Sequence, residues 1–370
     1  NTCAVRESAE SKVWSRFGRI RSLRQDGKTP IMVLAGCMAQ LPETAKRVKS
    51  RAPYVSVITG PGFIHEIPRL VREAISRNPQ DGGGKLLAAV TPGRTAASRD
   101  ESTQLLPEGL PRQAIPGLNA YVTIMYGCDN FCSYCVVPYV RGPQVSRSFD
   151  AIVEEVTRLC REGYKEITLL GQNVNAYGLD TPGGSDFPAL LRALDETPHL
   201  SRLRYFTSHP RDFTEDMIQA VRDCRTVCEH FHLPVQSGSD PVLRAMNRGY
   251  SRDDYFRLVE RVREVVPEAS ITTDIIVGFP GETAEDFEAT LDMVERCRFD
   301  GAFTFIFSPR KGTAAHRMKN QVDAKTKSLR LQELVETQGR ITRDLNARCV
   351  GQKVEVLIES LSEETQGSVK

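Results

Sequence analysis

The chain has 370 residues, of which 40% are hydrophobic and 26% are charged, and its formal net charge is +2. This composition is typical of a folded protein with two or three domains, and it excludes a disordered or fibrous chain. No apolar run approaches the roughly 20 residues that a membrane span requires. The ten Cys include tight clusters rather than a spaced disulfide framework, so we expect a cytoplasmic protein without a membrane contact.

The first part of the chain alternates between helical and strand patterns. Apolar periodicity predicts helices over 9–24 and 64–75, and short apolar runs predict buried strands over 31–35 and 55–59. We therefore expect a small α/β domain with a parallel sheet over 1–77. Residues 78–117 contain three successive glycines and scattered Pro, Ser and Thr, which predicts a linker too polar to pack well.

The part from 118 to 348 repeats a strand–helix pattern six times. Strands are predicted over 120–125, 166–170, 203–207, 230–234, 271–277 and 302–307. Helices are predicted over 151–161, 187–194, 215–222, 253–265, 284–297 and 324–345. If all six strand–helix–strand connections have the same handedness, these units form a partial parallel (βα)6 barrel. Ligands of such a barrel bind at the carboxyl ends of its strands. Residues 352–359 alternate like one exposed strand.

Cys128, Cys132 and Cys135 form a C-x3-C-x2-C run directly after the first predicted barrel strand. Three thiolates on one short loop suit a 4Fe-4S cluster in which one iron stays open to a small molecule. A structural zinc site usually has four ligands in two separated pairs, and no second pair follows here. Zinc or buried thiols remain the alternatives. The spacing favours chemistry over a structural role.

The residues around this run resemble the radical S-adenosylmethionine (SAM) signature of the methylthiotransferases, over 127–142 (GCDNFCSYCVVPYVRG). Other stretches resemble the same family: 1–6 (NTCAVR), 34–40 (LAGCMAQ), 170–177 (LGQNVNAY), 231–240 (FHLPVQSGSD) and 274–283 (DIIVGFPGET). Together they are most similar to the tRNA 2-methylthio-dimethylallyladenosine synthases of the MiaB type. The likeness runs from residue 1 to about residue 351 and weakens over 78–117.

The resemblance implies a division into an N-terminal methylthiotransferase domain over 1–77, a radical SAM domain over 118–348 and the start of an RNA-binding TRAM domain over 349–370. Because the chain opens inside a motif, and about twenty residues cannot close a small β-barrel, we expect the first and last of these to be truncated.

The resemblance also implies where SAM binds. It places Tyr134 on the adenine, although an aromatic residue that merely closes the core beneath the loop is the alternative. Polar residues and a glycine at the strand ends are predicted to bind the rest of SAM: Gln172, Asn173, Ser208, Gln236, Ser237, Asp274 and Gly278. Taken singly, each is explained as well by a turn or cap, so the prediction depends on their convergence at one end of the barrel.

A second 4Fe-4S cluster is implied at Cys3 and Cys37, where the family has three cysteines and the first would lie upstream of Asn1. Two isolated cysteines would otherwise be small buried hydrophobic residues. We expect Cys160, Cys297 and Cys349 to be such core residues.

The implied function is methylthiolation of C2 of isopentenyl-adenosine at position 37 of tRNA, next to the anticodon. One SAM methylates a sulfur of the second cluster, and another yields the radical that removes hydrogen from C2. The implied partners are tRNA and an electron donor such as a flavodoxin or ferredoxin. Four basic residues are predicted to contact RNA phosphates, with a solvated face as the alternative: Arg141, Arg147, Arg310 and Lys311.

Two rival substrates exist within the class: threonylcarbamoyl-adenosine in tRNA and an aspartate of a ribosomal protein. Outside it, the rivals are an iron–sulfur electron carrier and a simple RNA-binding module. Six predicted βα units exceed what a carrier needs, and the nearly neutral charge argues against the RNA-binding module.

Overall fold

The structure is a computed structural model that describes residues 1–2, 7–23, 31–77, 86–90, 108 and 117–359. The chain divides into two compact units. Residues 1–113, 126–145 and 310–313 form the first, here called the N-terminal unit. Residues 114–125, 146–309 and 314–370 form the second, the barrel unit.

The N-terminal unit contains a three-stranded parallel sheet in the order β1-β2-β3. Its strands are β1 (Val33–Ala35), β2 (Val57–Thr59) and β3 (Leu87–Ala89). The two predicted strands are therefore confirmed at β1 and β2, but β3 lies inside the stretch that we expected to be a linker. A strand forms there because the buried strand β2 offers a parallel neighbour for its backbone groups, and because Leu86 and Val90 at its two ends pack on the apolar core.

Five α-helices accompany this sheet in the described part of the unit: α1 (Glu7–Leu23), α2 (Cys37–Gln40), α3 (Thr44–Arg51), α4 (Ile67–Ser76) and α5 (Val137–Arg141). Phe17 of α1, Met38 of α2 and Val48 of α3 pack with Ile58 of β2 in one apolar core. The predicted helix over 64–75 starts as a 3-10 turn, Pro61–Glu66, and becomes α-helical at Ile67.

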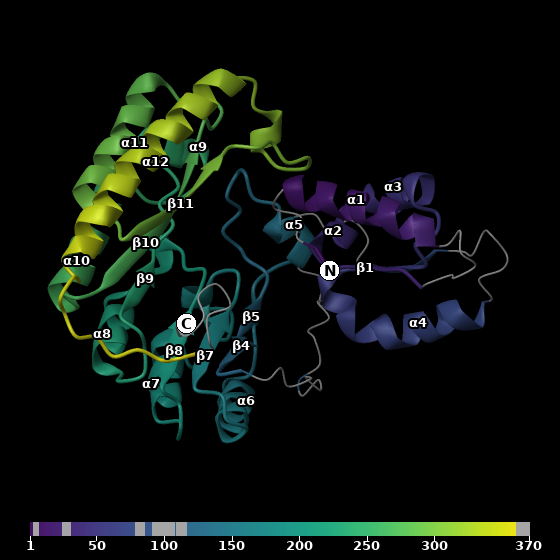
Figure 1. The fold of residues 1–370 in the computed structure, drawn as a ribbon, viewed down its shortest axis with the longest axis horizontal. Helices are drawn as coiled ribbons and strands as arrows, with labels where there is room; N and C mark the ends of the chain where they lie inside the picture. The colour runs from purple at the N-terminus through teal and green to yellow at the C-terminus, as the bar shows by residue number, and fades with distance from the viewer. Residues whose placement is uncertain (3–6, 24–30, 78–85, 91–107, 109–116, 360–370) are drawn as a thin grey trace. The chain divides into compact units, whose positions relative to one another are not determined.

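The barrel unit carries six parallel strands in two linked sheets (Figure 1). One sheet has the order β4 (Asn119–Thr123), β7 (Glu166–Leu170), β8 (Arg202–Tyr205), and the other the order β9 (His230–His232), β10 (Ser270–Val277), β11 (Gly301–Ile306). Leu203 of β8 forms a parallel bridge with Val227, just before β9, and so joins the two sheets. The predicted partial barrel is confirmed.

Helices cover one face of these strands (Figure 1): α6 (Phe149–Arg161), α7 (Phe187–Asp195), α8 (Glu215–Asp223), α9 (Asp240–Ala245), α10 (Arg252–Val265), α11 (Ala284–Cys297) and α12 (Ala324–Ala347). The six predicted helices agree with the structure to within two residues at each end. Their starts are set by side-chain caps such as Ser148, Ser251 and Thr283, which accept from backbone N–H groups of the first turn. The short helix α9 was not predicted.

Residues 352–359 form no strand, so the predicted exposed strand there is wrong. Val354 and Val356 are 69% and 66% exposed, and no strand in the described part of the chain pairs with them. An alternating pattern becomes a strand only when a partner satisfies its backbone. Among the described residues, no helix has both the length and the apolar character needed to cross a membrane.

Candidate functional site

The predicted cluster loop follows β5 (Met125–Tyr126), a two-residue strand that pairs with β6 (Val145–Ser146). The backbone N–H of Cys128 donates to the carbonyl of Gly142 at 3.2 Å, so the loop closes on itself. Gly127 has φ 70°, and a Cβ there would lie 1.8 Å from the carbonyl oxygen of Pro143. Only glycine fits this closure.

Cys128, Cys132 and Cys135 carry partly exposed thiols on this loop. The backbone N–H of Val137 points at Sγ of Cys135, 3.4 Å away, and such a donor stabilises a metal-binding thiolate. Across the described ranges, no three His, Cys, Asp or Glu side chains gather as ligands of one metal ion. In a 4Fe-4S cluster each cysteine binds a different iron, so its ligands lie farther apart than those of a single ion. Three partly exposed thiols on one closed loop are compatible with the predicted 4Fe-4S cluster, and their role as its ligands stays a prediction.

Tyr134 lies half-buried between the second and third of these cysteines. Its predicted place on the adenine of SAM stays a prediction.

Cys37 is the first residue of α2 and is buried. Nε of Arg141, at the end of α5, donates to Sγ of Cys37 at 3.2 Å. Val136 and Val140 pack on Cys37, with Leu41 beside them. The helix that follows Cys135 is thus in direct contact with the second predicted cysteine site.

Cys3, the other predicted ligand of that site, lies outside the described residues. Its neighbour Thr2 donates its N–H to the carbonyl of Ala35 at 3.1 Å and accepts from the N–H of Met38 at 3.4 Å. A Cβ at Gly36, whose φ is 97°, would come within 2.9 Å of the carbonyl oxygen of Thr2. The glycine before Cys37 is required by this close approach.

Two amide side chains follow β7 in the barrel unit, as predicted. Asn173 is 2% exposed and donates from Nδ2 to Oδ2 of Asp212 at 2.7 Å. Oδ1 of Asn173 and Oε1 of Gln172 are buried and have no hydrogen-bond partner among the residues that the structure describes. Buried acceptors without a donor are rare, so these two oxygens point to a ligand that donates hydrogen bonds.

Four more residues predicted to bind SAM follow β8 and β9 or lie in β10: Ser208, Gln236, Ser237 and Asp274. The hydroxyls of Ser208 and Ser237 are used inside the protein, the first by the carbonyl of His232 and the second by Thr290. Gln236 adopts φ 72°, a left-handed conformation that costs energy for any residue but glycine. Asp274 of β10 lies 3.5 Å from Nε2 of His232 through Oδ1. The two serines therefore fit a structural role better than SAM binding.

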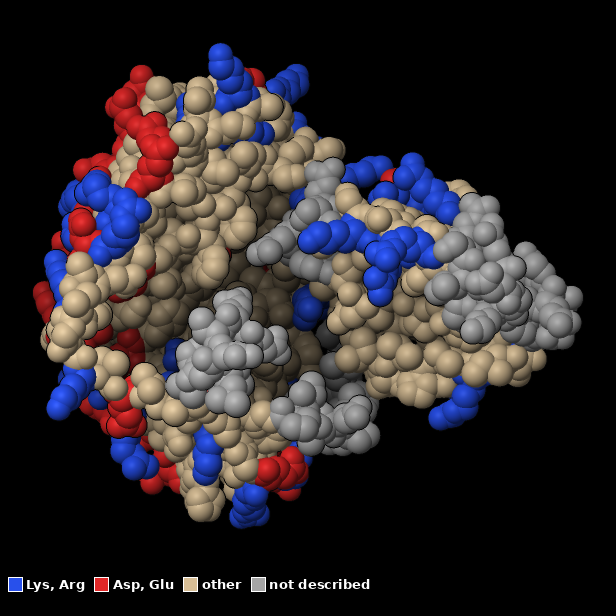
Figure 2. Space-filling model, in the orientation of Figure 1, with Lys and Arg blue, Asp and Glu red and all other residues tan. Residues whose placement is uncertain are grey.

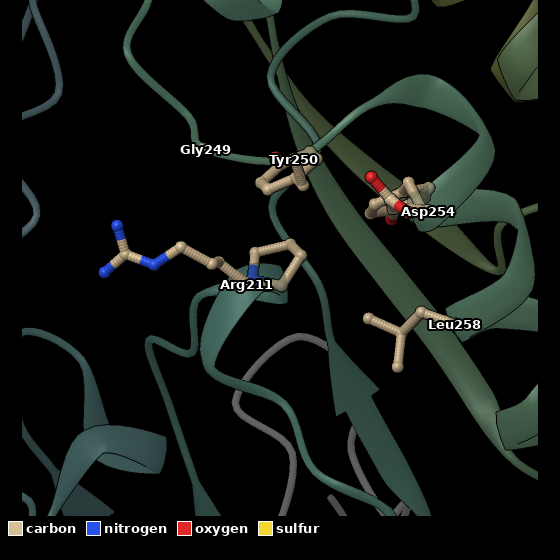
Figure 3. A pocket seen from close by; sticks show the side chains of 7 residues that line it. Arg211, Gly249, Tyr250, Asp254 and Leu258 are labelled. Atoms are coloured by element: carbon tan, nitrogen blue, oxygen red, sulfur yellow. The ribbon is translucent and has the colours of Figure 1, made fainter.

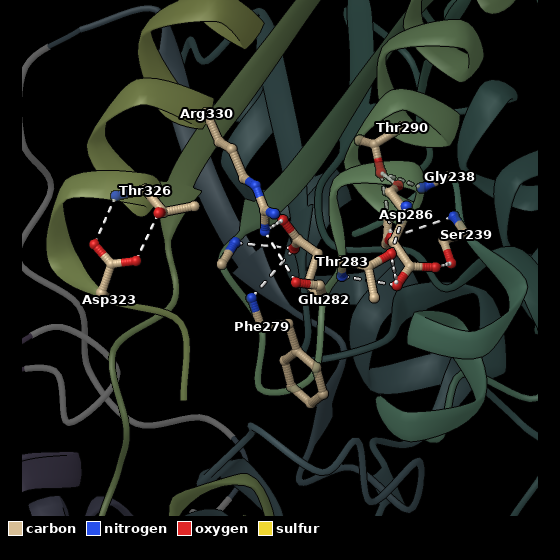
Figure 4. Close-up of polar contacts among 12 residues, drawn as sticks. Gly238, Ser239, Phe279, Glu282, Thr283, Asp286, Thr290, Asp323, Thr326 and Arg330 are labelled. Atoms are coloured by element: carbon tan, nitrogen blue, oxygen red, sulfur yellow. Dashed lines mark hydrogen bonds and ion pairs between the residues drawn. The ribbon is translucent and has the colours of Figure 1, made fainter. Parts of the chain in front are cut away.

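The loop after β10 is held by Glu282, which the sequence prediction missed (Figure 4). Its carboxylate accepts from the N–H groups of Gly278 and Phe279 at 2.9 and 3.2 Å, and from Nη1 of Arg330 at 2.7 Å. Burial raises the pKa of Glu282, and the three donors oppose that shift. Gly278 itself has φ 72°, and a Cβ there would lie 2.3 Å from Cγ of Lys327. The only sequence signal was the position of this glutamate inside the 274–283 motif.

A second set of polar contacts begins beside it and ties α11 to the loop after β9. Thr283 and Asp286 form a capping box, and Asp286 also accepts from the hydroxyl of Ser239 (Figure 4). Thr290 accepts from the N–H of Gly238 at 3.0 Å. These contacts fix the backbone at the predicted SAM-binding end of β9.

His209 is a further buried polar residue, outside the set predicted to bind SAM. Its Nδ1 accepts from the N–H of Arg211 at 3.3 Å, and its Nε2 is buried without a partner among the described residues. Burial, followed by the charges of Arg248 and Arg211, lowers its pKa to about 2. The ring is therefore neutral at any physiological pH.

A pocket opens beside His209, lined by Pro210, Arg211, Gly249, Tyr250, Asp254, Tyr255 and Leu258. The Arg211 side chain points away from Asp254 (Figure 3). None of the residues predicted to bind SAM lines this pocket.

The four basic residues predicted to contact RNA all have partners within the protein. Arg147 is paired with Glu155 at 2.8 Å, and Arg310 with Glu10 at 3.3 Å; their side chains are 9% and 12% exposed. The exposed Lys311 is paired with Glu43, and Arg141 donates to Cys37. Lys and Arg alternate with Asp and Glu along the outer helices of the barrel unit (Figure 2). RNA contact by these four residues stays a prediction, and the pairs weaken it.

Two family models match the chain. Residues 122–294 match the model described as the radical SAM superfamily, and residues 1–60 match one described as uncharacterized protein family UPF0004.

Curated relatives cover almost the whole chain. A tRNA-2-methylthio-N(6)-dimethylallyladenosine synthase of Acetivibrio thermocellus is 44% identical over 98% of this chain and 72% of its own length. The enzymes of that name from Pelotomaculum thermopropionicum and Desulforamulus reducens are 45% and 46% identical. They cover 100% and 97% of this chain, and 79% and 75% of their own lengths.

Two solved structures have a similar fold. The radical S-adenosylmethionine methyltransferase TsrM from Kitasatospora setae, solved with cobalamin and a 4Fe-4S cluster, superposes with a TM-score of 0.58 at 18% identity, over 82% of this chain and 61% of that one. The cobalamin-dependent S-adenosylmethionine radical enzyme OxsB superposes with a TM-score of 0.53 at 12% identity, over 88% of this chain and 46% of that one. At such identities the likeness concerns the fold alone.

Proposed function

Because this chain belongs to the family of the tRNA-2-methylthio-N(6)-dimethylallyladenosine synthases, we propose that it attaches a methylthio group to C2 of isopentenyl-adenosine next to the anticodon of tRNA. It is a radical SAM methylthiotransferase that uses SAM and 4Fe-4S clusters. The observation that carries this function is the closed C-x3-C-x2-C loop in a chain whose other unit is a six-stranded parallel barrel.

Cys128, Cys132 and Cys135 hold the first cluster. When bound, it supplies the electron that breaks a carbon–sulfur bond of SAM. The closed loop keeps the three sulfurs together, and the tight turn at Gly127 fixes where the first of them sits.

The barrel unit orients SAM in this proposal. The partnerless oxygens of Gln172 and Asn173 accept from the ammonium group of SAM, which supplies the missing donors. The backbone at Gly278, held by Glu282, approaches the adenine in this proposal. Asp274 and Gln236, at the neighbouring strand ends, complete the set in the barrel unit. Tyr134, on the cysteine loop of the N-terminal unit, is proposed separately as a residue that packs on the adenine.

Cys3 and Cys37 belong to the second cluster, which provides the sulfur. The segment at Thr2 runs beside Gly36 and Met38, and this supports a shared site for the two cysteines. We also propose the domain division at 1–77, 118–348 and 349–370, a cytoplasmic location, and a small electron donor such as a flavodoxin or ferredoxin.

The substrate nucleotide must leave its stack for C2 to meet the radical. This costs least in an unpaired loop, and the anticodon loop provides such a position. The names of the relatives favour the prenylated adenosine over the two rival substrates of the class.

The test is anaerobic incubation of the reconstituted protein with SAM, a strong reductant and one of three substrates: tRNA from cells that prenylate adenosine, tRNA from cells that do not, or the ribosomal protein. We expect 5′-deoxyadenosine and a methylthiolated nucleoside with the prenylated tRNA only. Equal methylthiolation of unprenylated tRNA, of threonylcarbamoyl-adenosine or of a ribosomal protein would overturn the substrate assignment. Absence of 5′-deoxyadenosine under all conditions would overturn the radical chemistry.

A further inference from the structure

Arg141 connects two cysteine sites that lie far apart in the sequence. It is the last residue of α5, six positions after Cys135, and its Nε–H points at the sulfur of Cys37 from 3.2 Å. All of these residues belong to the N-terminal unit. The contact is partly buried, because Val136 and Val140 of the same segment pack on Cys37.

We propose that Arg141 is a positioning residue for the second cluster: it holds the sulfur of Cys37 in place and stabilises the negative charge that this sulfur carries as a ligand. The inference rests on the proposed function, since it takes Cys37 to be a cluster ligand. It assigns Arg141 to the cluster instead of to the RNA phosphates.

The chemistry of the contact supports this role. A guanidinium is always charged, and its hydrogen bond to an anionic acceptor is about twice as strong as a neutral one. Hydrogen bonds to cluster sulfurs are among the factors that set the reduction potential, and groups bonded to a metal ligand typically change affinity by about 10–100-fold. Loss of the donor should therefore loosen the cluster and make its reduction harder.

The packing explains why Arg141 can do this. Val140 is 6% and Val136 4% exposed, so α5 is anchored on the α2 side by apolar contacts next to the hydrogen bond. An arginine at the end of an anchored helix loses little further freedom when it binds the sulfur. The arrangement also fixes how the segment after Cys135 lies against Cys37.

The test uses the intact protein with Cys128, Cys132 and Cys135 replaced by Ala, so that only the second cluster forms. Arg141→Gln removes the charge and the guanidinium, Arg141→Lys keeps a charged donor, and Arg51→Gln removes an exposed arginine of the same unit as a matched control. The two readouts are the reduction potential, followed by electron paramagnetic resonance, and the rate of iron loss to a chelator.

We expect Arg141→Gln to lose iron about tenfold faster and to have a more negative potential, with Arg141→Lys in between and Arg51→Gln unchanged. Equal potentials and equal iron loss in all variants would overturn the role of Arg141 while leaving the proposed function intact. If the parent with intact Cys37 held no cluster at all, both the inference and the two-cluster function would fall. If Arg141→Gln lost tRNA binding while its cluster properties stayed unchanged, the proposed role would be overturned and Arg141 would be assigned to RNA contact.

Discussion

The cysteines of the loop and the cysteines of the barrel helices have opposite surroundings. Those of the loop are partly exposed, and a backbone N–H faces the sulfur of Cys135. Cys224 and Cys297 are buried in the apolar core, and burial raises their pKa values to about 11 and 12. A thiol that cannot lose its proton makes a poor metal ligand. The difference teaches that exposure or a hydrogen-bond donor beside the sulfur, as Arg141 is for the buried Cys37, separates candidate ligands from packing residues.

The sharpest way to break this comparison is to remove the loop thiols. Replacing Cys128, Cys132 and Cys135 by Ala should reduce 5′-deoxyadenosine formation to background, because no ligand then remains for the first cluster. Cys160→Ala, a buried cysteine of α6, is the matched control and should keep the activity. Anaerobic product analysis of both variants is the measurement. Radical formation by the triple variant would show that the loop is not the cluster site.

Cys37→Ala should separate the two steps. We expect 5′-deoxyadenosine formation to persist while the methylthiolated nucleoside disappears, because the sulfur-supplying site loses a ligand that the radical step does not use. Mass spectrometry of digested tRNA, alongside quantification of 5′-deoxyadenosine, makes the comparison. Wild-type amounts of methylthio product in this variant would rule out Cys37 as a ligand.

Thiol alkylation of the iron-free, folded protein measures the contrast directly. With a pKa of about 12, Cys297 is deprotonated at pH 8 in only about one molecule in ten thousand. The loop thiols are partly exposed and are therefore open to the reagent. We expect them to react with iodoacetamide much faster than Cys297, as peptide mass mapping would show. Comparable rates would remove the basis of the comparison.

The same penalty on a buried charge applies to His209. Its pKa in the folded protein is about 2, whereas an unfolded chain has the ordinary value near 6.5. Below pH 6.5 the unfolded state binds a proton at this histidine and the folded state does not. The free energy of unfolding therefore decreases by about 1.4 kcal/mol for each unit by which the pH is lowered. Denaturant unfolding between pH 7 and pH 5 should show a shallower loss in His209→Gln than in the parent.

The control for this pH dependence is His199→Gln, because His199 is exposed. It should retain the slope of the parent. A parental slope in His209→Gln would mean that other groups cause the acid sensitivity.

The barrel was predictable because period-two and period-3.6 patterns alternate cleanly, and because caps such as Ser251 and Thr283 mark the helix starts. The strand Leu87–Ala89 was not predicted, since the short apolar run 86–90 shows no periodicity, lies in a stretch rich in Gly, Pro, Ser and Thr, and becomes a strand only beside a tertiary neighbour. Residues 352–359 failed for the converse reason: the pattern is present, but no described strand pairs with it.

The candidate site was predictable where spacing within one segment carries it, as in the cysteine loop. Contacts between segments that are distant in the sequence could not be predicted. Arg141 on Cys37, and Glu282 with Arg330, join residues 104 and 48 positions apart, which no local pattern records. Cys349 was expected in the core and is exposed, because it lies beyond the end of α12, past the last turn that packs on the sheet.

The contact between Glu282 and Arg330 has a consequence for the order in which a ribosome delivers the parts. The loop after β10 is synthesised before α12, but its carboxylate is nearly buried and has its cation only in α12, 48 residues later. A buried carboxylate without its counter-charge is costly. We therefore expect the loop to reach its folded conformation only after α12 has left the ribosomal exit tunnel. Helix α12 thus completes the loop after β10, and a chain that stops before Arg330 lacks the counter-charge of this carboxylate.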